Sequence, residues 1–152
     1  MSRYLAIDYG GKRIGLAVCD TETRIAMPVT SVPGAGDAIM DVQTVHVAAG
    51  RYDVDEFVVG LPLNMDGTEG PQAKLVRRFG AELKRATNKP VHFWDERLSS
   101  VAAQEKLAPA GLTRKKKKAR LDRVAAQTFL QDFLESLPLP SRQDQQPPGD
   151  NL

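Results

Sequence analysis

Four carboxylates are the residues of this sequence with the clearest chemical potential. Asp8 ends the first apolar run, and Asp95 and Glu96 end a later one. Asp122 interrupts the apolar side of a late helical segment, where a carboxylate is costly unless it is paired or coordinates a metal. Three such groups, brought together at the carboxyl ends of strands, favour a hard divalent cation, Mg²⁺ or Mn²⁺. Two such ions can activate water for phosphodiester hydrolysis.

The same acids also have an ordinary structural explanation. Asp8 and Asp95 could be turn acids at strand ends, and Asp122 could be a solvated helix residue. Side chains alternate along a strand, so Asp95 and Glu96 are expected on opposite faces of the sheet. Only one of that pair is therefore expected to be a ligand.

The elements that position these acids begin with an expected antiparallel meander. Apolar runs at 4–8 and 13–20 flank a Gly-Gly turn at 10–11, which is typical of a hairpin because glycine can adopt positive φ. A third run at 25–32 contains Pro28. Proline cannot donate to a ladder, so this strand is predicted at an edge of the sheet.

After the meander the pattern alternates between helices and strands. Asp37 is expected to cap a helix that ends near residue 49, and Pro71 to open one that ends near residue 86. Their buried faces are predicted from helical spacing to include Ile39, Val42, Val45 and Ala49, and then Leu75, Phe79 and Leu83. The other expected elements are strands at 56–61 and 91–94, a helix at 102–107 capped by Ser99 or Ser100, and a helix at 118–137. Because helical crossovers require parallel pairing, we predict the α/β class, with a five-stranded mixed sheet and helices on both faces.

Length and composition bound the function classes. With 152 residues, 41% hydrophobic and 26% charged, the chain fits one globular domain, expected over 1–137. The proline-rich segment 138–152 has few apolar residues and is expected to be a disordered tail. No run approaches the length of a membrane span, so no membrane partner is expected. The single Cys19 cannot form an internal disulfide, which favours a cytoplasmic location.

Basic residues cluster although the net charge is only +2. Between residues 114 and 123 there are seven basic residues against one acid, which indicates a polyanionic partner such as nucleic acid, unless the run is merely a solvated face. Lys12 and Arg13 follow the glycine turn beside Asp8, and Arg97 follows Glu96; each could bind a phosphate. Lys12 and Arg13 could equally be exposed hairpin charges, and Arg97 could instead orient a carboxylate. The candidate substrate-binding residues are Lys12, Arg13, Arg97, Arg114, Lys115, Lys116, Lys117, Lys118 and Arg120.

Four blocks of the sequence resemble one family. DYGGKRIGLA at 8–17, VVGLPLNMDG at 58–67, DERLSS at 95–100 and LDRVAAQTFLQ at 121–131 are similar, in the same order, to motifs of the YqgF/RuvX family. Members of that family are described as Holliday junction resolvases and as nucleases of pre-16S ribosomal RNA. The resemblance implies a ribonuclease H-like fold with strand order 3-2-1-4-5. It also implies that Asp8, Glu96 and Asp122 are the catalytic metal ligands, with Asp95 as the substitute for Glu96.

One departure from resolvases of this fold affects the site. They carry a catalytic acid at the end of the fourth strand, whereas this chain continues into Gly60-Leu61-Pro62. The acid must then come from the fifth strand.

The function expected from the resemblance is a metal-dependent nuclease, a hydrolase acting on ester bonds, in 5′-end processing of pre-16S rRNA. The alternatives are a Holliday junction resolvase-like DNA nuclease, which would need a homodimer for symmetric cleavage, and a non-catalytic RNA-binding ribosome-assembly factor. An ATPase or sugar kinase of the actin type shares the expected sheet, but such enzymes grip ATP between two lobes and are far longer than this chain.

Overall fold

The structure is a computed structural model that describes residues 1–10, 12–98 and 114–137, with the backbone alone for 114–124. The predicted helix at 102–107, its caps Ser99 and Ser100, and the predicted tail at 138–152 lie outside these residues. In chain order the described elements are β1 (Arg3–Tyr9), β2 (Arg13–Asp20), β3 (Met27–Pro33), α1 (Ala38–Arg51), β4 (Glu56–Leu61), α2 (Pro71–Thr87), β5 (Val91–Asp95), the short 3₁₀ helix η1 (Glu96–Leu98) and α4 (Arg114–Ser136).

The five strands form one mixed sheet in the order β3-β2-β1-β4-β5. The antiparallel meander predicted for the start of the chain is confirmed, since β1 pairs with β2 and β2 with β3 in antiparallel register. β4 and β5 then add in parallel on the other side of β1. β3 is an edge strand, as Pro28 predicted. The predicted fold class and strand order are therefore confirmed.

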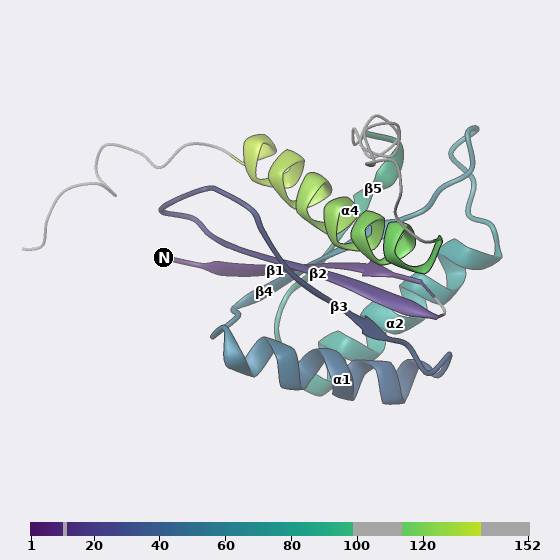
Figure 1. Ribbon diagram of the computed structural model, residues 1–152, viewed down its shortest axis with the longest axis horizontal. Helices are drawn as coiled ribbons and strands as arrows, with labels where there is room; N and C mark the ends of the chain where they lie inside the picture. The colour runs from purple at the N-terminus through teal and green to yellow at the C-terminus, as the bar shows by residue number, and fades with distance from the viewer. Residues whose placement is uncertain (11, 99–113, 138–152) are drawn as a thin grey trace, which may run out of the picture.

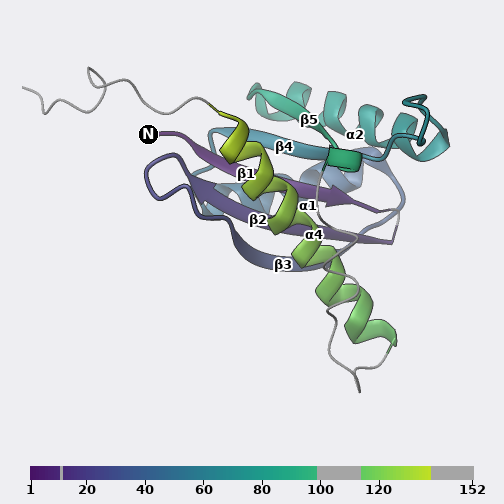
Figure 2. The same cartoon turned by 90° about the horizontal axis from the view of Figure 1, so that it is seen from above.

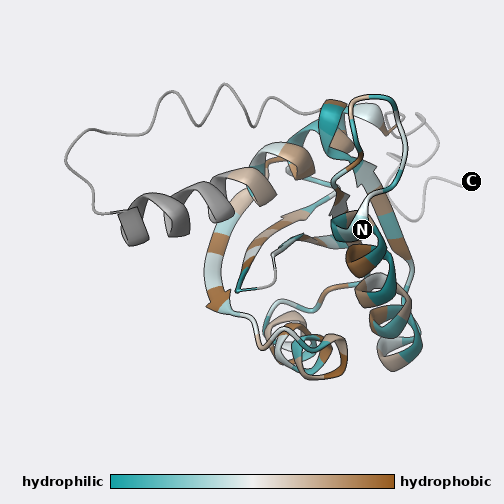
Figure 3. Cartoon of the chain, turned by 90° about the vertical axis from the view of Figure 1, so that its right-hand side faces the viewer, coloured by the Kyte–Doolittle hydropathy of each residue, from teal (hydrophilic) through white to brown (hydrophobic). Residues whose placement is uncertain are grey.

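Helices cover both faces of the sheet. Figures 1 and 2 show α4 crossing one face while α1 and α2 lie together on the other, and Figure 3 shows the same layers from the side. The cluster between the sheet and α1 and α2 contains Leu5, Ile7, Phe57 and Phe79. The smaller cluster beneath α4 contains Tyr4, Ala6, Val58, Phe129 and Leu130. Odd-numbered residues of β1 thus face α1 and α2, and even-numbered residues face α4.

The helix starts follow the sequence signals, and two details of the packing differ. The Asp37 carboxylate accepts hydrogen bonds from the amides of Ile39 and Met40, as an N-cap should, and Pro71 occupies the first turn of α2. Ile39 and Leu75 were predicted to be buried, but their exposed fractions are 58% and 53%. Each lies at the rim of its helix's buried stripe, which the structure centres on Val42, Val45 and Ala49 in α1 and on Ala73, Val76, Phe79 and Leu83 in α2.

α4 also begins earlier than predicted. The helix starts at Arg114 rather than near Lys118, so the basic run belongs to its first turns. Lysine and arginine are good helix formers, so nothing in the run prevents this extension. The buried residues of the second half, Ala126, Phe129, Leu130 and Leu134, anchor the helix to the sheet.

A buried polar pair fixes the end of β1 on the face opposite Asp8. Asp41 is the buried charged residue of the described chain, 1% exposed, and the Tyr9 hydroxyl donates to its Oδ2 at 2.6 Å. The Ala35 amide donates to Oδ1 at 2.7 Å, so both carboxylate oxygens are satisfied. The Tyr9 ring stacks on Phe79 with centroids 4.1 Å apart. The strand end that carries Asp8 is therefore held by both α1 and α2.

We expect Gly80→Ala to destabilise the fold without replacing any residue of the candidate site. A Cβ on Gly80 would overlap the Cζ atom of Phe93 and lie 2.8 Å from its Cε1 atom, inside the packed layer between α2 and β5. Overpacking of this kind costs about 1–3 kcal/mol. Urea denaturation measures the loss as a lower midpoint at unchanged slope. An unchanged midpoint would contradict this packing.

Candidate active site

Asp8 lies at the carboxyl end of the central strand with little side-chain bulk beside it. It is half-buried and pairs with Gly15 on β2. On the other side, Ile7 pairs with Val59 of β4, so the residue beside Asp8 in the next register position is Gly60. Two glycines therefore flank Asp8 on the neighbouring strands. Their missing side chains leave room on the α4 face of the sheet for groups that come from elsewhere.

Glu96 occupies the space above Gly60. A Cβ placed on Gly60 would overlap Oε1 of Glu96 and lie 3.2 Å from its Cδ atom and 3.0 Å from Cε1 of Phe129. Glu96 follows directly after β5, which pairs in parallel with β4 through Gly60 and Trp94. The Glu96 carboxylate, just after β5, thus reaches back across β4 at Gly60, the one position of β4 that has no side chain to block it.

The side chains of Glu96 and Asp8 lie close enough for a hydrogen bond with Asp8 to act on the pKa of Glu96. Burial raises the pKa of Glu96, the hydrogen bond to Asp8 opposes that rise, and the nearby Asp95 charge adds to it. Two carboxylates this close repel each other unless they share a proton or a cation. The pair is therefore a strained arrangement for two anions and a suitable one for binding positive charge.

Asp95 is engaged elsewhere. Its carboxylate accepts from the Arg97 guanidinium at 2.8 Å (Nη2 to Oδ2) and from Nε, and it also accepts from the Arg97 amide at 2.9 Å. These bonds to Arg97 hold the pKa of Asp95 below its ordinary value. Because Asp95 is already neutralised by this ion pair, Glu96 is the member of the pair whose carboxylate is available at Asp8.

The described side chains supply two metal-ligating groups here rather than three. Within the described residues no group of three or more His, Cys, Asp or Glu side chains is placed to hold a metal ion. Asp122 lies in α4 four residues before the buried Ala126, but its side chain is outside the described part. The donor set of Asp8 and Glu96 fits Mg²⁺ or Mn²⁺, since both are hard cations that prefer carboxylate oxygen.

The candidate phosphate-binding residues other than Arg97 lie in two places. Lys12 is exposed in the β1–β2 turn, and the Arg13 side chain at the start of β2 donates to Ser31 Oγ at 3.2 Å. The basic residues 114–118 and Arg120 lie in the first turns of α4, where the structure describes the backbone alone. Figure 2 shows these turns extending past the β3 edge of the sheet.

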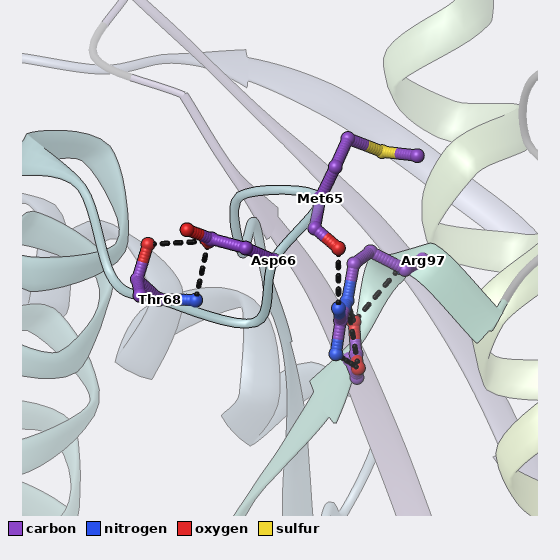
Figure 4. Close-up of polar contacts among 5 residues, drawn as sticks. Met65, Asp66, Thr68 and Arg97 are labelled. Carbon is purple, nitrogen blue, oxygen red and sulfur yellow. Dashed lines mark hydrogen bonds and ion pairs between the residues drawn. The ribbon is translucent and has the colours of Figure 1, made fainter.

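Arg97 connects the end of β5 to the loop after β4. Besides its ion pair with Asp95, its Nη1 donates to the Met65 carbonyl oxygen at 3.2 Å (Figure 4). Gly67, at φ +87°, faces the guanidinium: a Cβ added there would be in ordinary van der Waals contact with it, 3.6 Å from Nη1. The guanidinium therefore holds the loop after β4 to the end of β5, a contact that we call the Arg97 clamp. Arg97 binds the carboxylate of Asp95 and not that of Glu96, and its predicted contact with a phosphate stays a prediction.

We expect Arg97→Lys to loosen the loop without unfolding the chain. A lysine ammonium cannot form the two-pronged contact with Asp95 while also reaching the Met65 carbonyl. Because this ion pair is exposed and screened by solvent, its loss should speed opening of the loop only modestly. Hydrogen exchange of the Gly67 and Thr68 amides measures this. Equal exchange in both proteins would show that Arg97 does not clamp the loop.

Gly60 is the functional position that the sequence analysis treated only as a missing acid. Its glycine makes the approach of Glu96 possible. A glycine inside a strand often marks a close approach of another group, and that signal was present in the sequence. The group that approaches it could not be identified without the register of β4 and β5.

The fold places the chain in a known structural class. RuvC of Thermus thermophilus, solved in complex with a Holliday junction substrate, superposes with a TM-score of 0.54, covering 90% of this chain and 95% of that one at 14% identity. A second T. thermophilus RuvC structure gives 0.50. At this identity the likeness shows the fold, which is ribonuclease H-like.

The sequence comparisons then give the family. Residues 2–136 match the RuvX family, described as "Holliday junction resolvase". Relatives named "Putative pre-16S rRNA nuclease" come from Chloroflexus aurantiacus, 45% identical over 132 residues (87% of this chain and 86% of the relative), and Anaeromyxobacter dehalogenans, 44% identical over 133 residues (88% and 96%). The chain belongs to the RuvX (YqgF) family of nucleases. None of its described helices is both long and apolar enough to cross a membrane.

Proposed function

We propose that this protein is a divalent-metal-dependent nuclease that hydrolyses phosphodiester bonds in the 5′-end processing of pre-16S rRNA. The observation that carries the proposal is the meeting of the Asp8 and Glu96 carboxyl groups over Gly60. The relatives' names support the RNA substrate. The single, buried Cys19 is consistent with work in the cytoplasm.

In this proposal Asp8 and Glu96 hold Mg²⁺ or Mn²⁺, and Asp122 completes the ligand set from α4. The bound ion would supply an activated water and would neutralise charge at the scissile phosphate. Asp8 is fixed because β1 is held from the opposite face by the Tyr9–Asp41 hydrogen bond. Glu96 is fixed because Gly60 leaves room for it.

The basic residues hold the substrate. Backbone phosphates are contacted by two groups of basic residues, so binding weakens steeply as salt rises. These groups are Lys12 with Arg13, and the run Arg114, Lys115, Lys116, Lys117, Lys118 and Arg120. Arg97 contributes by holding the loop after β4 beside the site. Contacts of this kind position a nucleic acid and leave its sequence unread.

The test is cleavage of a labelled 5′ precursor fragment of 16S rRNA with Mg²⁺ or Mn²⁺, beside an Asp8→Asn variant. Cleavage by the wild-type chain and none by the variant is the expected result. Cleavage that the variant retains would overturn the role of Asp8. Binding without cleavage in both would favour a ribosome-assembly factor that makes no cuts.

A four-way DNA junction is the second substrate to include. The description of the RuvX family as a Holliday junction resolvase and the RuvC-like fold favour this candidate. Symmetric cleavage requires two active sites, and hence a homodimer. Faster cleavage of the junction than of the rRNA fragment would show that the substrate is a DNA junction and not pre-16S rRNA.

A further inference from the structure

The loop after β4 presents an apolar side chain to solvent beside the candidate site. Met65 is 91% exposed, more than any other large apolar side chain in the described part of the chain. Figure 4 shows its side chain extending away from the Arg97 guanidinium, while its carbonyl oxygen points toward it. Exposure of this kind contributes nothing to folding, because the side chain buries no surface.

The turn that carries Met65 is built to hold one shape. The Gly67 amide donates to the Asn64 carbonyl at 2.8 Å, which closes a turn with Met65 and Asp66 at its centre. Gly67 itself takes φ +87°, a conformation that favours glycine. Met65 is therefore displayed from a defined turn.

Side chains reinforce the turn from both ends. The Asp66 carboxylate accepts from the Thr68 hydroxyl at 2.6 Å and from the Thr68 amide at 3.0 Å. The Asn64 side chain donates to the same hydroxyl at 3.0 Å. Arg97 fixes the apex through the Met65 carbonyl. A contact made by Met65 would thus cost little ordering entropy at the moment of binding.

The turn is also bound to the segment that carries Glu96. Arg97, which binds the Met65 carbonyl, directly follows Glu96 in the chain. Leu98, the next residue, is also exposed, at 67%. Two exposed apolar side chains are thus carried by the turn that Arg97 binds and by the segment that follows Glu96.

We propose that Met65 packs against the face of an unstacked nucleobase next to the scissile phosphate. This inference rests on the proposed nuclease function and names its substrate class, a nucleic acid with an unpaired nucleotide at the cut. Apolar side chains that take the place of a neighbouring base are a known way to hold distorted nucleic acid, and methionine is suited to contact with aromatic rings. The contact does not depend on the nucleotide sequence, because every base has an aromatic face.

The test is binding in the Asp8→Asn background, so that no probe is cut. One RNA probe carries 2-aminopurine at an unpaired nucleotide, and a second is the same RNA fully paired. Met65→Ala is compared with Met65→Leu and with Met40→Ala, a matched exposed methionine on α1 that is 57% exposed. We expect Met65→Ala to bind the unpaired probe about fivefold to tenfold more weakly, and to bind the paired probe as before.

The other outcomes of this experiment also support or overturn the inference. Met65→Leu should keep most of the affinity and of the 2-aminopurine fluorescence change, since it keeps an apolar side chain. Equal binding of the unpaired probe by Met65→Ala and Met40→Ala would overturn the inference while leaving the nuclease proposal standing. Failure of every protein to bind either RNA would overturn the proposed function, and this inference with it.

Discussion

We expect Glu96→Gln to lower the rate of phosphodiester cleavage on the order of a thousandfold, because in the proposed site several kcal/mol of transition-state charge stabilisation depend on a cation held by Asp8 and Glu96. The amide has nearly the same shape as the carboxyl group, so it still fits over Gly60. It removes the charge that the cation requires. Single-turnover cleavage of a labelled RNA, at saturating protein, measures the chemical step separately from binding.

Asp95→Asn is the matched control for this variant. The two acids are neighbours in sequence, but Asp95 is bound to Arg97 and Glu96 to Asp8. We expect the Asp95 variant to lose much less, since it loosens the Arg97 clamp and leaves the carboxyl pair in place. A larger loss for Asp95→Asn than for Glu96→Gln would show that the wrong acid has been assigned.

Gly60→Ala has the second largest expected effect. The added methyl group would occupy the position of Glu96 Oε1 and would press on Phe129, so the Glu96 carboxylate must move away from Asp8. Displacing a catalytic group by about 1 Å can cost roughly a hundredfold in rate. The measurement is again single-turnover cleavage, with the fold checked by urea denaturation.

Two comparisons isolate the cause of that loss. Gly50→Ala, in α1, is the matched glycine variant, because a Cβ there meets nothing within 4 Å, and it should leave cleavage unchanged while stabilising the helix by about 0.5–1 kcal/mol. In a Glu96→Ala background the Gly60→Ala change should cost little further in cleavage rate, since the carboxylate it displaces is gone and only the contact with Phe129 remains. Additive losses in the double variant would mean that Gly60 acts independently of Glu96.

Much of the fold follows from local pattern. The apolar runs at β1, β2 and β3 and the Gly-Gly turn predict the meander, and Asp37 and Pro71 mark two helix starts where the structure has them. The misplaced residues Ile39 and Leu75 show the limit of spacing alone. A rotation of about 100° per residue separates Leu75 from Val76, and only the partner surface decides which of them is buried.

The candidate site was predictable only in part. Alternation along β5 predicts that Asp95 and Glu96 separate to opposite faces, and the structure gives each a different partner. Which face meets Asp8 depends on the parallel register of β4 and β5, a long-range pairing that no local signal encodes. The contact of Arg97 with the Met65 carbonyl likewise joins segments far apart in the sequence, whereas the ion pair of Arg97 with Asp95 is local.

Mn²⁺ binding tests the central claim, a cation site built from Asp8 and Glu96, more directly than any rate. Titration followed by electron paramagnetic resonance counts the bound ion in wild-type protein, Asp8→Asn, Glu96→Gln and the control Asp95→Asn. We predict binding by wild type and Asp95→Asn, and a loss of affinity beyond about a hundredfold in the other two, because a lost ligand should cost at least as much as a lost outer-shell partner. Equal Mn²⁺ affinity in all four proteins would contradict the site.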